Sequence, residues 1–258
     1  MNPLRILAAT ALAALSLSAH AVGRLADISI HDRATGRELP VIWHEGRAYV
    51  VGRPGNEYQL NVKSRSGEDL LAIMSVDGVN VLSGQTASAT HGGGYVLSPW
   101  ENASIRGWRK SMEEIAAFYF TSLGDSYAAR TGRPDNVGVI GVALYQRRRE
   151  EPRVEADAAA QSAPYRSKRE GLAEKSLDSA TRGAPSAPSA PLGTGHGRRE
   201  HSPTRFVSFE RSTEQPVETI AIYYDSHRNL VAQGVLPTYG AGPRNPNPWP
   251  TGFVPDPR

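Results

Sequence analysis

The chain has 258 residues, a formal net charge of +3 and no cysteine. Its length allows one large domain or two small ones. The lack of cysteine excludes disulfides, cysteine nucleophiles, cysteine zinc sites and lipid attachment at an N-terminal cysteine. Basic residues are dispersed, and only Arg147–Arg149 forms a run. Since nucleic-acid-binding surfaces cluster basic residues among aromatic ones, we expect no nucleic-acid partner.

The first 21 residues have the pattern of a secretory signal peptide. Arg5 precedes an apolar stretch, Ile6–Leu17, which is too short to span a bilayer, and small residues follow it. We place the cleavage between Ala21 and Val22. The sequence therefore predicts a periplasmic or secreted protein with no transmembrane segment after signal removal.

Residues 22–146 read as the main β domain. Short apolar segments, many with alternating polarity, are separated by Gly, Asp and Pro. Two tight turns are expected, at His44-Glu45-Gly46 and at Asp77-Gly78, and the polar span 83–94 is expected to be a mobile loop. Strands are predicted at 25–31, 38–52 (a hairpin), 58–62, 70–76, 79–82, 95–97 and 137–145, and residues 105–108 fit either a short strand or a bend.

The stretch 112–121 fits two structures. Ser111 and Glu114 match a helix capping box, whereas Ile115–Thr121 is rich in the aromatic residues of a buried strand. The surrounding β pattern favours the strand. A short helix, Ser126–Arg130, is predicted next, since Gly132 and Pro134 would end it.

Composition changes at Arg147. Residues 147–203 are dominated by Ala, Ser, Pro, Glu and Arg, and such a segment buries too little apolar surface to fold, so we predict a disordered linker. Strands at 205–209, 217–224 and 229–235 form a predicted C-terminal cluster within 204–239, which we expect to dock on the main domain. The tail 240–258 is proline-rich and should be extended.

The fold class that follows is all-β. About ten short strands with regularly spaced turns are typical of a β-sandwich or a partly open barrel. Here that fold would carry a long disordered linker and a short C-terminal strand cluster.

Several segments together resemble a group of uncharacterised exported proteins of Gram-negative bacteria. The segments are Val76–Val81, Gly94–Leu97, Ile105–Arg109, Phe118–Phe120, Asn136–Gly141, Gly193–Gly197 and Phe209–Arg211. The resemblance implies a periplasmic or envelope setting and implies no reaction.

The stretch Gly193–His201 contains the residues that favour metal binding. His196, Glu200 and His201 are side chains that zinc accepts. Their spacing, His-x3-Glu-His, is one residue longer than the His-x2-Glu-His metalloprotease pattern, which also needs a helix. Glycines 193, 195 and 197 would instead allow a backbone nest for an anion, with Gly195 and His196 as ligand contacts. A plain flexible junction is the third interpretation.

A second candidate set would suit a carbohydrate or peptide. It combines polar side chains near a turn with an aromatic and a guanidinium group: Asp77, Asn80, Tyr95, Trp108 and Arg109. Asp77-Gly78 can equally be an ordinary hairpin turn, and Trp108 can be a core residue.

The sequence lacks a Gly-x-Ser-x-Gly nucleophile motif and a P-loop, so we predict no cofactor. Our leading hypothesis is an exported, non-enzymatic binding module that contacts an envelope protein or a cell-wall component. One alternative is a periplasmic metal-dependent hydrolase using His196, Glu200 and His201, with Asp77 as a possible addition. Another is a glycan-binding module using Tyr95 and Trp108.

Overall fold

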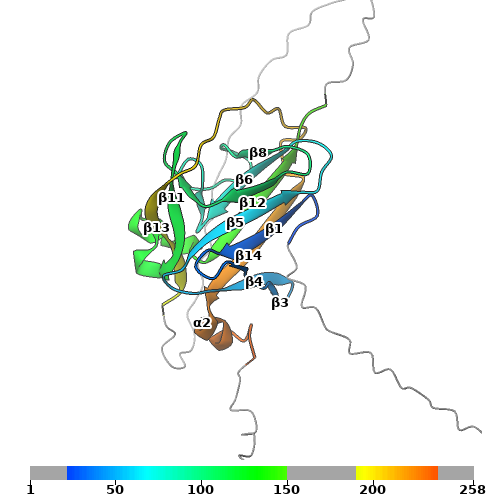
Figure 1. Ribbon diagram of the computed structural model, residues 1–258. Helices are drawn as coiled ribbons and strands as arrows, with labels where there is room; N and C mark the ends of the chain where they lie inside the picture. Colours follow the sequence, from blue (N-terminus) through cyan, green and yellow to red (C-terminus); the bar gives the residue numbers. More distant parts are fainter. Residues whose placement is uncertain (1–21, 150–189, 238–258) are drawn as a thin grey trace, which may run out of the picture.

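The computed structural model describes residues 22–149 and 190–237, and within them two β-sheets pack face to face (Figure 1). The all-β, sandwich-like fold class is confirmed. The predictions for the signal peptide, for most of the linker and for the proline-rich tail fall on residues outside the described ranges.

Sheet A is antiparallel, and two of its strands have several partners. β11 pairs with β10, β5 and β13, while β5 pairs with β1 and β9. The strands are β1 (Ala26–Asp32), β2 (Arg37–Glu38), β5 (Glu57–Ser64), β9 (Asn102–Ile105), β10 (Gly107–Arg109), β11 (Glu114–Ser122) and β13 (Leu192–His201).

Sheet B has the order β3-β4-β14-β12-β6-β7, with β8 also paired to β6. Only the β14–β4 pair is parallel. Its strands are β3 (Ile42–His44), β4 (Arg47–Gly52), β6 (Leu70–Val76), β7 (Val79–Asn80), β8 (Tyr95–Leu97), β12 (Val139–Gln146) and β14 (Glu218–Ser226). The helices are short: η1 (Leu123–Asp125), α1 (Tyr127–Arg130), η2 (Pro134–Asn136) and α2 (His227–Ala232).

The core lies between the sheets and follows from the alternation of each strand. In β5, for example, Tyr58, Leu60 and Val62 are fully buried while the residues between them are partly exposed. β6 is buried on nearly every residue. Its outward Leu71 and Ile73 form a second, smaller cluster with Ala143 and Tyr145 of the neighbouring strand, so part of the outer face of sheet B is also covered.

Several local predictions are confirmed. Residues 114–122 form strand β11, not a helix, and α1 begins within the predicted helix, with Ser126 as its N-cap. Glu45 and Asp77 adopt positive φ in the two predicted tight turns, at 48° and 52°. In Asp77, a short polar side chain makes this backbone conformation accessible.

The prediction of a disordered linker is wrong for residues 192–201. They form β13, which pairs with β11 from Ser122 to Glu114 around a bulge. Its glycines permit close approach, since a Cβ at Gly195 would lie 2.2 Å from the Tyr119 ring. The partner strand therefore orders a segment whose own composition favours no strand.

Two of the three predicted C-terminal strands are also absent. Residues 205–209 run without strand pairing, and the predicted strand at 229–235 is largely α2, which Ser226 caps by accepting a hydrogen bond from the Asn229 amide. The remaining strand, β14, does not dock on a finished domain. It inserts between β4 and β12 in the middle of sheet B, so residues on both sides of the predicted linker build one sandwich.

Candidate functional site

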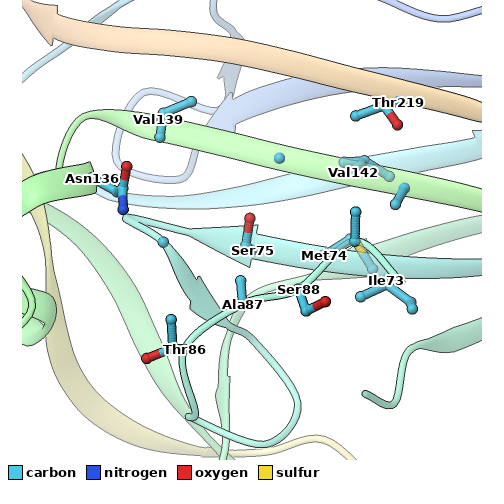
Figure 2. A pocket seen from close by; sticks show the side chains of 14 residues that line it. Ile73, Met74, Ser75, Thr86, Ala87, Ser88, Asn136, Val139, Val142 and Thr219 are labelled. Carbon is cyan, nitrogen blue, oxygen red and sulfur yellow. The ribbon is translucent and has the colours of Figure 1, made fainter. Parts of the chain in front are cut away.

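The outer face of sheet B carries a groove of about 320 Å³. Its floor is formed by outward residues of β6, β12 and β14, and one wall is formed by the loop residues Thr86–Ala89 (Figure 2). The lining residues, which we call the sheet B groove, are Ile73, Met74, Ser75, Gly78, Thr86, Ala87, Ser88, Ala89, Asn136, Val139, Gly141, Val142, Ala143 and Thr219. Every one of these side chains is a hydrocarbon, hydroxyl, thioether or amide group, so the lining is uncharged.

The floor is open because its residues are small. Gly141 lies opposite Ser75 in the β12–β6 pair, and a Cβ on Gly141 would come within 2.7 Å of the Ser75 hydroxyl oxygen. Next along the floor are Ala143 and Thr219, which are partners in the β12–β14 pair. A ligand can therefore approach the sheet closely along this line.

The loop wall is fixed by bonds to its carbonyl groups. The Tyr145 hydroxyl donates to the Ala89 carbonyl (2.6 Å), and the Arg211 guanidinium donates to the Thr90 and Gly92 carbonyls (2.6 and 3.0 Å). The same guanidinium lies 4.4 Å from the centre of the Tyr145 ring. The expected mobile loop is thus tied to the sheet at several points.

An aromatic strip continues from the groove on the same face. Tyr49 and Tyr223 are partners in the β4–β14 pair with ring centres 5.5 Å apart, and His44 lies edge-on to Tyr49. Tyr223 is in turn the partner of Val139, which lines the groove. The groove and the strip of His44, Tyr49 and Tyr223 therefore form one continuous surface.

A second polar arrangement is buried between the sheets. Asp77 accepts hydrogen bonds from the Tyr224 hydroxyl (2.5 Å), the Gly138 amide (2.9 Å) and the Thr194 amide (2.7 Å). The Thr194 hydroxyl lies 2.6 Å from that of Tyr58 and 2.7 Å from that of Tyr224. An ionised carboxylate only accepts hydrogen bonds. When Asp77 is charged, the Tyr58 hydroxyl therefore donates to Thr194, the Thr194 hydroxyl donates to Tyr224, and the Tyr224 hydroxyl donates to Asp77.

Burial controls the ionisation of this network. It raises the pKa of Asp77 to about 6, although the hydrogen bonds from Tyr224, Gly138 and Thr194 oppose that rise. Burial, with the nearby Asp77 charge, also raises the pKa of Tyr58 and Tyr224 well above the ordinary tyrosine value. All four side chains are at most 2% exposed, so the network joins the two sheets and offers no surface to a ligand.

The structure places the predicted contact residues Asp77 and Asn80 in the interior. The Asn80 side chain accepts from the amides of Leu82 and Ser83 and donates to the Gly93 carbonyl. Asn80 thus satisfies backbone groups of its own loop, whereas Asp77 satisfies amides of segments distant in the chain, as buried polar groups must.

Tyr95 and Arg109 are brought together, but Trp108 is not beside them on the surface. The Arg109 guanidinium donates to the Tyr95 hydroxyl (3.2 Å) and to the Ser202 carbonyl. Trp108 is 3% exposed, and its indole donates to the Gly195 carbonyl. The hypothesis of a glycan surface built on Tyr95 and Trp108 is therefore wrong, because the indole faces the core.

The candidate metal ligands on β13 do not converge. Glu200 pairs with the guanidinium groups of Arg33 (2.9 Å) and Arg198 (2.7 Å), with Arg106 at 3.8 Å. His196 packs on the Tyr127 ring, with 5.5 Å between ring centres, and partial burial and nearby Lys110 lower its pKa. Within residues 22–149 and 190–237, no group of three or more His, Asp or Glu side chains is placed to hold a metal ion.

The groove and the aromatic strip were not predicted from the sequence. One signal was available: once Ile140 and Val142 are assigned inward, the alternating positions of β12 are Gly141 and Ala143, which are unusually small for a strand. The same alternation places Ala221 between Thr219 and Tyr223 on the outer face of β14.

Comparisons with protein-family models, with curated proteins and with solved structures found no match. In the part of the chain that the structure describes, no helix is both long and apolar enough to cross a membrane.

Proposed function

We propose that this protein is an exported, non-enzymatic binding module of the bacterial envelope, and that it binds a protein or cell-wall component on the outer face of sheet B. The observation that supports the proposal is the uncharged groove and its continuation into the aromatic strip. A concave, mainly apolar surface with a few hydroxyl groups on its rim is typical of ligand sites. The groove itself is lined by no ionisable side chain, which favours binding over acid–base chemistry.

The shape suits an extended ligand. A floor of small residues between the loop wall, Thr86–Ala89, and the rings of Tyr49 and Tyr223 forms a trough across β12 and β14. Aromatic rings offer flat apolar surface to proline or sugar rings at little entropic cost. The rim hydroxyls of Ser88 and Thr219 can exchange hydrogen bonds with the ligand backbone or ring substituents.

Site-specific photo-crosslinking tests this proposal in cells that export the protein. A photoreactive amino acid replaces Thr219, which is exposed on the groove floor, and in a matched variant replaces Ser104, which is exposed on β9 of sheet A. We expect adducts to an envelope protein or to cell-wall fragments from position 219 and none from position 104. The same adducts from both positions, or no adduct from either, would contradict the proposal.

A groove-blocking variant provides the second readout. Ala221 is exposed beside the groove, so Ala221→Arg places a long charged side chain on the floor without displacing a buried group. The variant should lose the adducts from position 219 while its circular dichroism spectrum is unchanged. Undiminished adducts would show that the ligand lies elsewhere.

A further inference from the structure

The floor of the sheet B groove lies in the middle of its sheet. β12 pairs with β6 on one side and with β14 on the other, and β14 pairs also with β4. The backbone N–H and C=O groups of these strands therefore bond to neighbouring strands, whereas a peptide that binds by adding a strand needs a free sheet edge. A ligand on this floor must instead be held through its own faces and substituents.

Four polar side chains around the groove have unused hydrogen-bonding capacity. They are Ser75, Thr86, Asn136 and Thr219 (Figure 2), and none of them makes a side-chain hydrogen bond in the part of the chain that the structure describes. A hydroxyl group both donates and accepts hydrogen bonds, and so does a primary amide. The edge of a sugar ring carries hydroxyl groups with the same two capacities, so the groove and a sugar ring are complementary.

A guanidinium group lies beside this floor. Arg47 and Ala221 directly precede Ala48 and Ile222, which are partners in the parallel β4–β14 pair. Arg47 and Ala221 are therefore neighbours on the outer face of sheet B, and both are exposed. The partner of Ala221 in β12 is Gly141 of the groove floor. The row from Arg47 to Gly141 thus spans two strand spacings, or about 10 Å.

The charge of Arg47 is available to a ligand. Its guanidinium carbon lies 5.8 Å from the centre of the Tyr223 ring, and within the described residues it makes no ion pair of 4.0 Å or less. The acid that is close in sequence, Glu45, has a side chain that is 83% exposed and lies 3.9 Å from His44. Because a guanidinium group binds carboxylates through paired hydrogen bonds, Arg47 favours a ligand with an anionic group.

We propose that the groove and the aromatic strip bind a linear glycan that carries carboxylate groups. The inference rests on the proposed function, since it takes the same surface as the binding site and names the ligand class. One sugar ring would pack its apolar C–H face on Tyr49 and Tyr223. Its neighbour would lie over Ala221 and Gly141, where its carboxylate meets Arg47 and its hydroxyl groups meet the four polar side chains.

A proline-rich peptide fits the same groups less well. Proline rings would also pack on the two tyrosines, but proline has no N–H group and its ring has no polar atom. Such a peptide could offer only carbonyl groups to Ser75 and Thr219. It would also place no anionic group beside Arg47. The free hydroxyl groups and the free guanidinium therefore favour the acidic glycan.

An NMR titration of the protein purified after export tests the inference. The probes are oligogalacturonate and oligoglucuronate, each with its methyl ester, which keeps the sugar rings and removes the charges. We expect the acids to shift the amide signals of Gly141, Ala221 and Tyr223. The esters should bind about fivefold more weakly, which is the affinity that one exposed ion pair contributes, and high salt should remove this difference.

A matched pair of variants identifies the guanidinium group. Arg47→Gln should bind acid and ester equally, with the affinity of the ester unchanged. Arg37→Gln removes an exposed guanidinium from β2 of sheet A, so it should keep the fivefold preference. Both variants change an exposed side chain, and their circular dichroism spectra should match that of the parent protein.

Three outcomes would overturn the inference. The first is the absence of shifts with either acid, and the second is equal affinity of the parent protein for acid and ester. The third is tighter binding of a proline-rich peptide than of either acid. If one of these occurs while position 219 still captures an envelope protein in cells, the proposed function stands and this inference fails. If the acids bind through Arg47 and no adduct forms in cells, the inference stands and the proposed function fails.

Discussion

The pH dependence of stability should report the buried carboxyl of Asp77. Burial raises its pKa to about 6 from 3.8, so between these values the folded protein binds more protons than the unfolded chain. The contribution of Asp77 to stability is therefore greatest below pH 3.8 and is lost as the pH rises through about 6. At 1.36 kcal/mol for each pKa unit, ionised Asp77 lowers the free energy of unfolding at pH 7 by about 3 kcal/mol.

Asp77→Asn isolates this effect. Asparagine tolerates the positive φ of 52° at this position, and it cannot titrate. Its amide nitrogen would face either the Thr194 amide or the donors Gly138 and Tyr224, and leaving a buried donor unpaired costs about 1–3 kcal/mol. At pH 7 the gain in free energy of unfolding from removing the buried charge and the loss from the unpaired donor should nearly offset each other. At pH 4 the variant should be less stable than the parent protein by about 1–3 kcal/mol.

Urea denaturation at a series of pH values, followed by circular dichroism, measures both effects. The difference between parent and variant is the informative quantity, because it cancels other carboxyl groups such as Asp32 and Glu57. The pKa of Asp32 is held low by hydrogen bonds from Asn56, Thr35 and Ala34 that outweigh its burial, and that of Glu57 by Arg198. Those groups stabilise the fold above their unfolded pKa and lose this effect as the pH falls. A difference that stays constant from pH 4 to pH 7 would refute the reasoning.

Three further predictions concern packing, ion pairs and the buried hydroxyl groups. Gly107→Ala should lower the free energy of unfolding by more than about 1 kcal/mol, because the added Cβ would lie 2.1 Å from the Ala116 carbonyl oxygen. Gly67→Ala is the control, since no atom lies within 4 Å of its added Cβ, and its free energy of unfolding should change little. Glu200→Gln should lower the free energy of unfolding by about 1–3 kcal/mol, since its side chain is 8% exposed among guanidinium groups. Glu114→Gln should lower it by at most about 1 kcal/mol, since the Glu114 side chain is 43% exposed; equal losses would contradict this. In ultraviolet absorption, the two tyrosines of the buried network should ionise only when alkali unfolds the protein, and their early titration would show that the interior is accessible.

The sequence predicted the sandwich where strand alternation is strong and local. β5, β6 and β12 have regular apolar positions, and the turn at Asp77-Gly78 has its own backbone chemistry. β13 could not be predicted in this way. Its Gly- and Arg-rich composition favours no structure alone, and β11 supplies the order through pairing between distant parts of the chain.

The candidate site was predicted less well, because polar residues near turns have the same sequence pattern whether their side chains face water or the core. One hydrogen-bond donor to Asp77 is the amide of Thr194, 117 residues later in the chain, and no local pattern reveals that contact. The residues of the groove, in contrast, suggested no site in the sequence. Most of its lining residues are Gly, Ala, Ser and Thr, which carry no chemical signature, and the groove can be recognised only when the positions of residues in the sheet are known.

The position of β14 connects the assembly of the fold to the binding surface. β6 and β12 come from the first described stretch, while β14 comes from the second, and its partners are β4 on one side and β12 on the other. The groove floor and the aromatic strip both need residues from the two stretches: Gly141 with Thr219, and Tyr49 with Tyr223. Because a central strand cannot be withdrawn without exposing backbone groups on both neighbours, the surface proposed for binding exists only once both stretches have paired. A destabilising change away from the groove, as in Gly107→Ala, should therefore weaken ligand capture in proportion to the unfolded fraction. A change beside the groove floor, as in Ala221→Arg, should weaken capture without unfolding the protein.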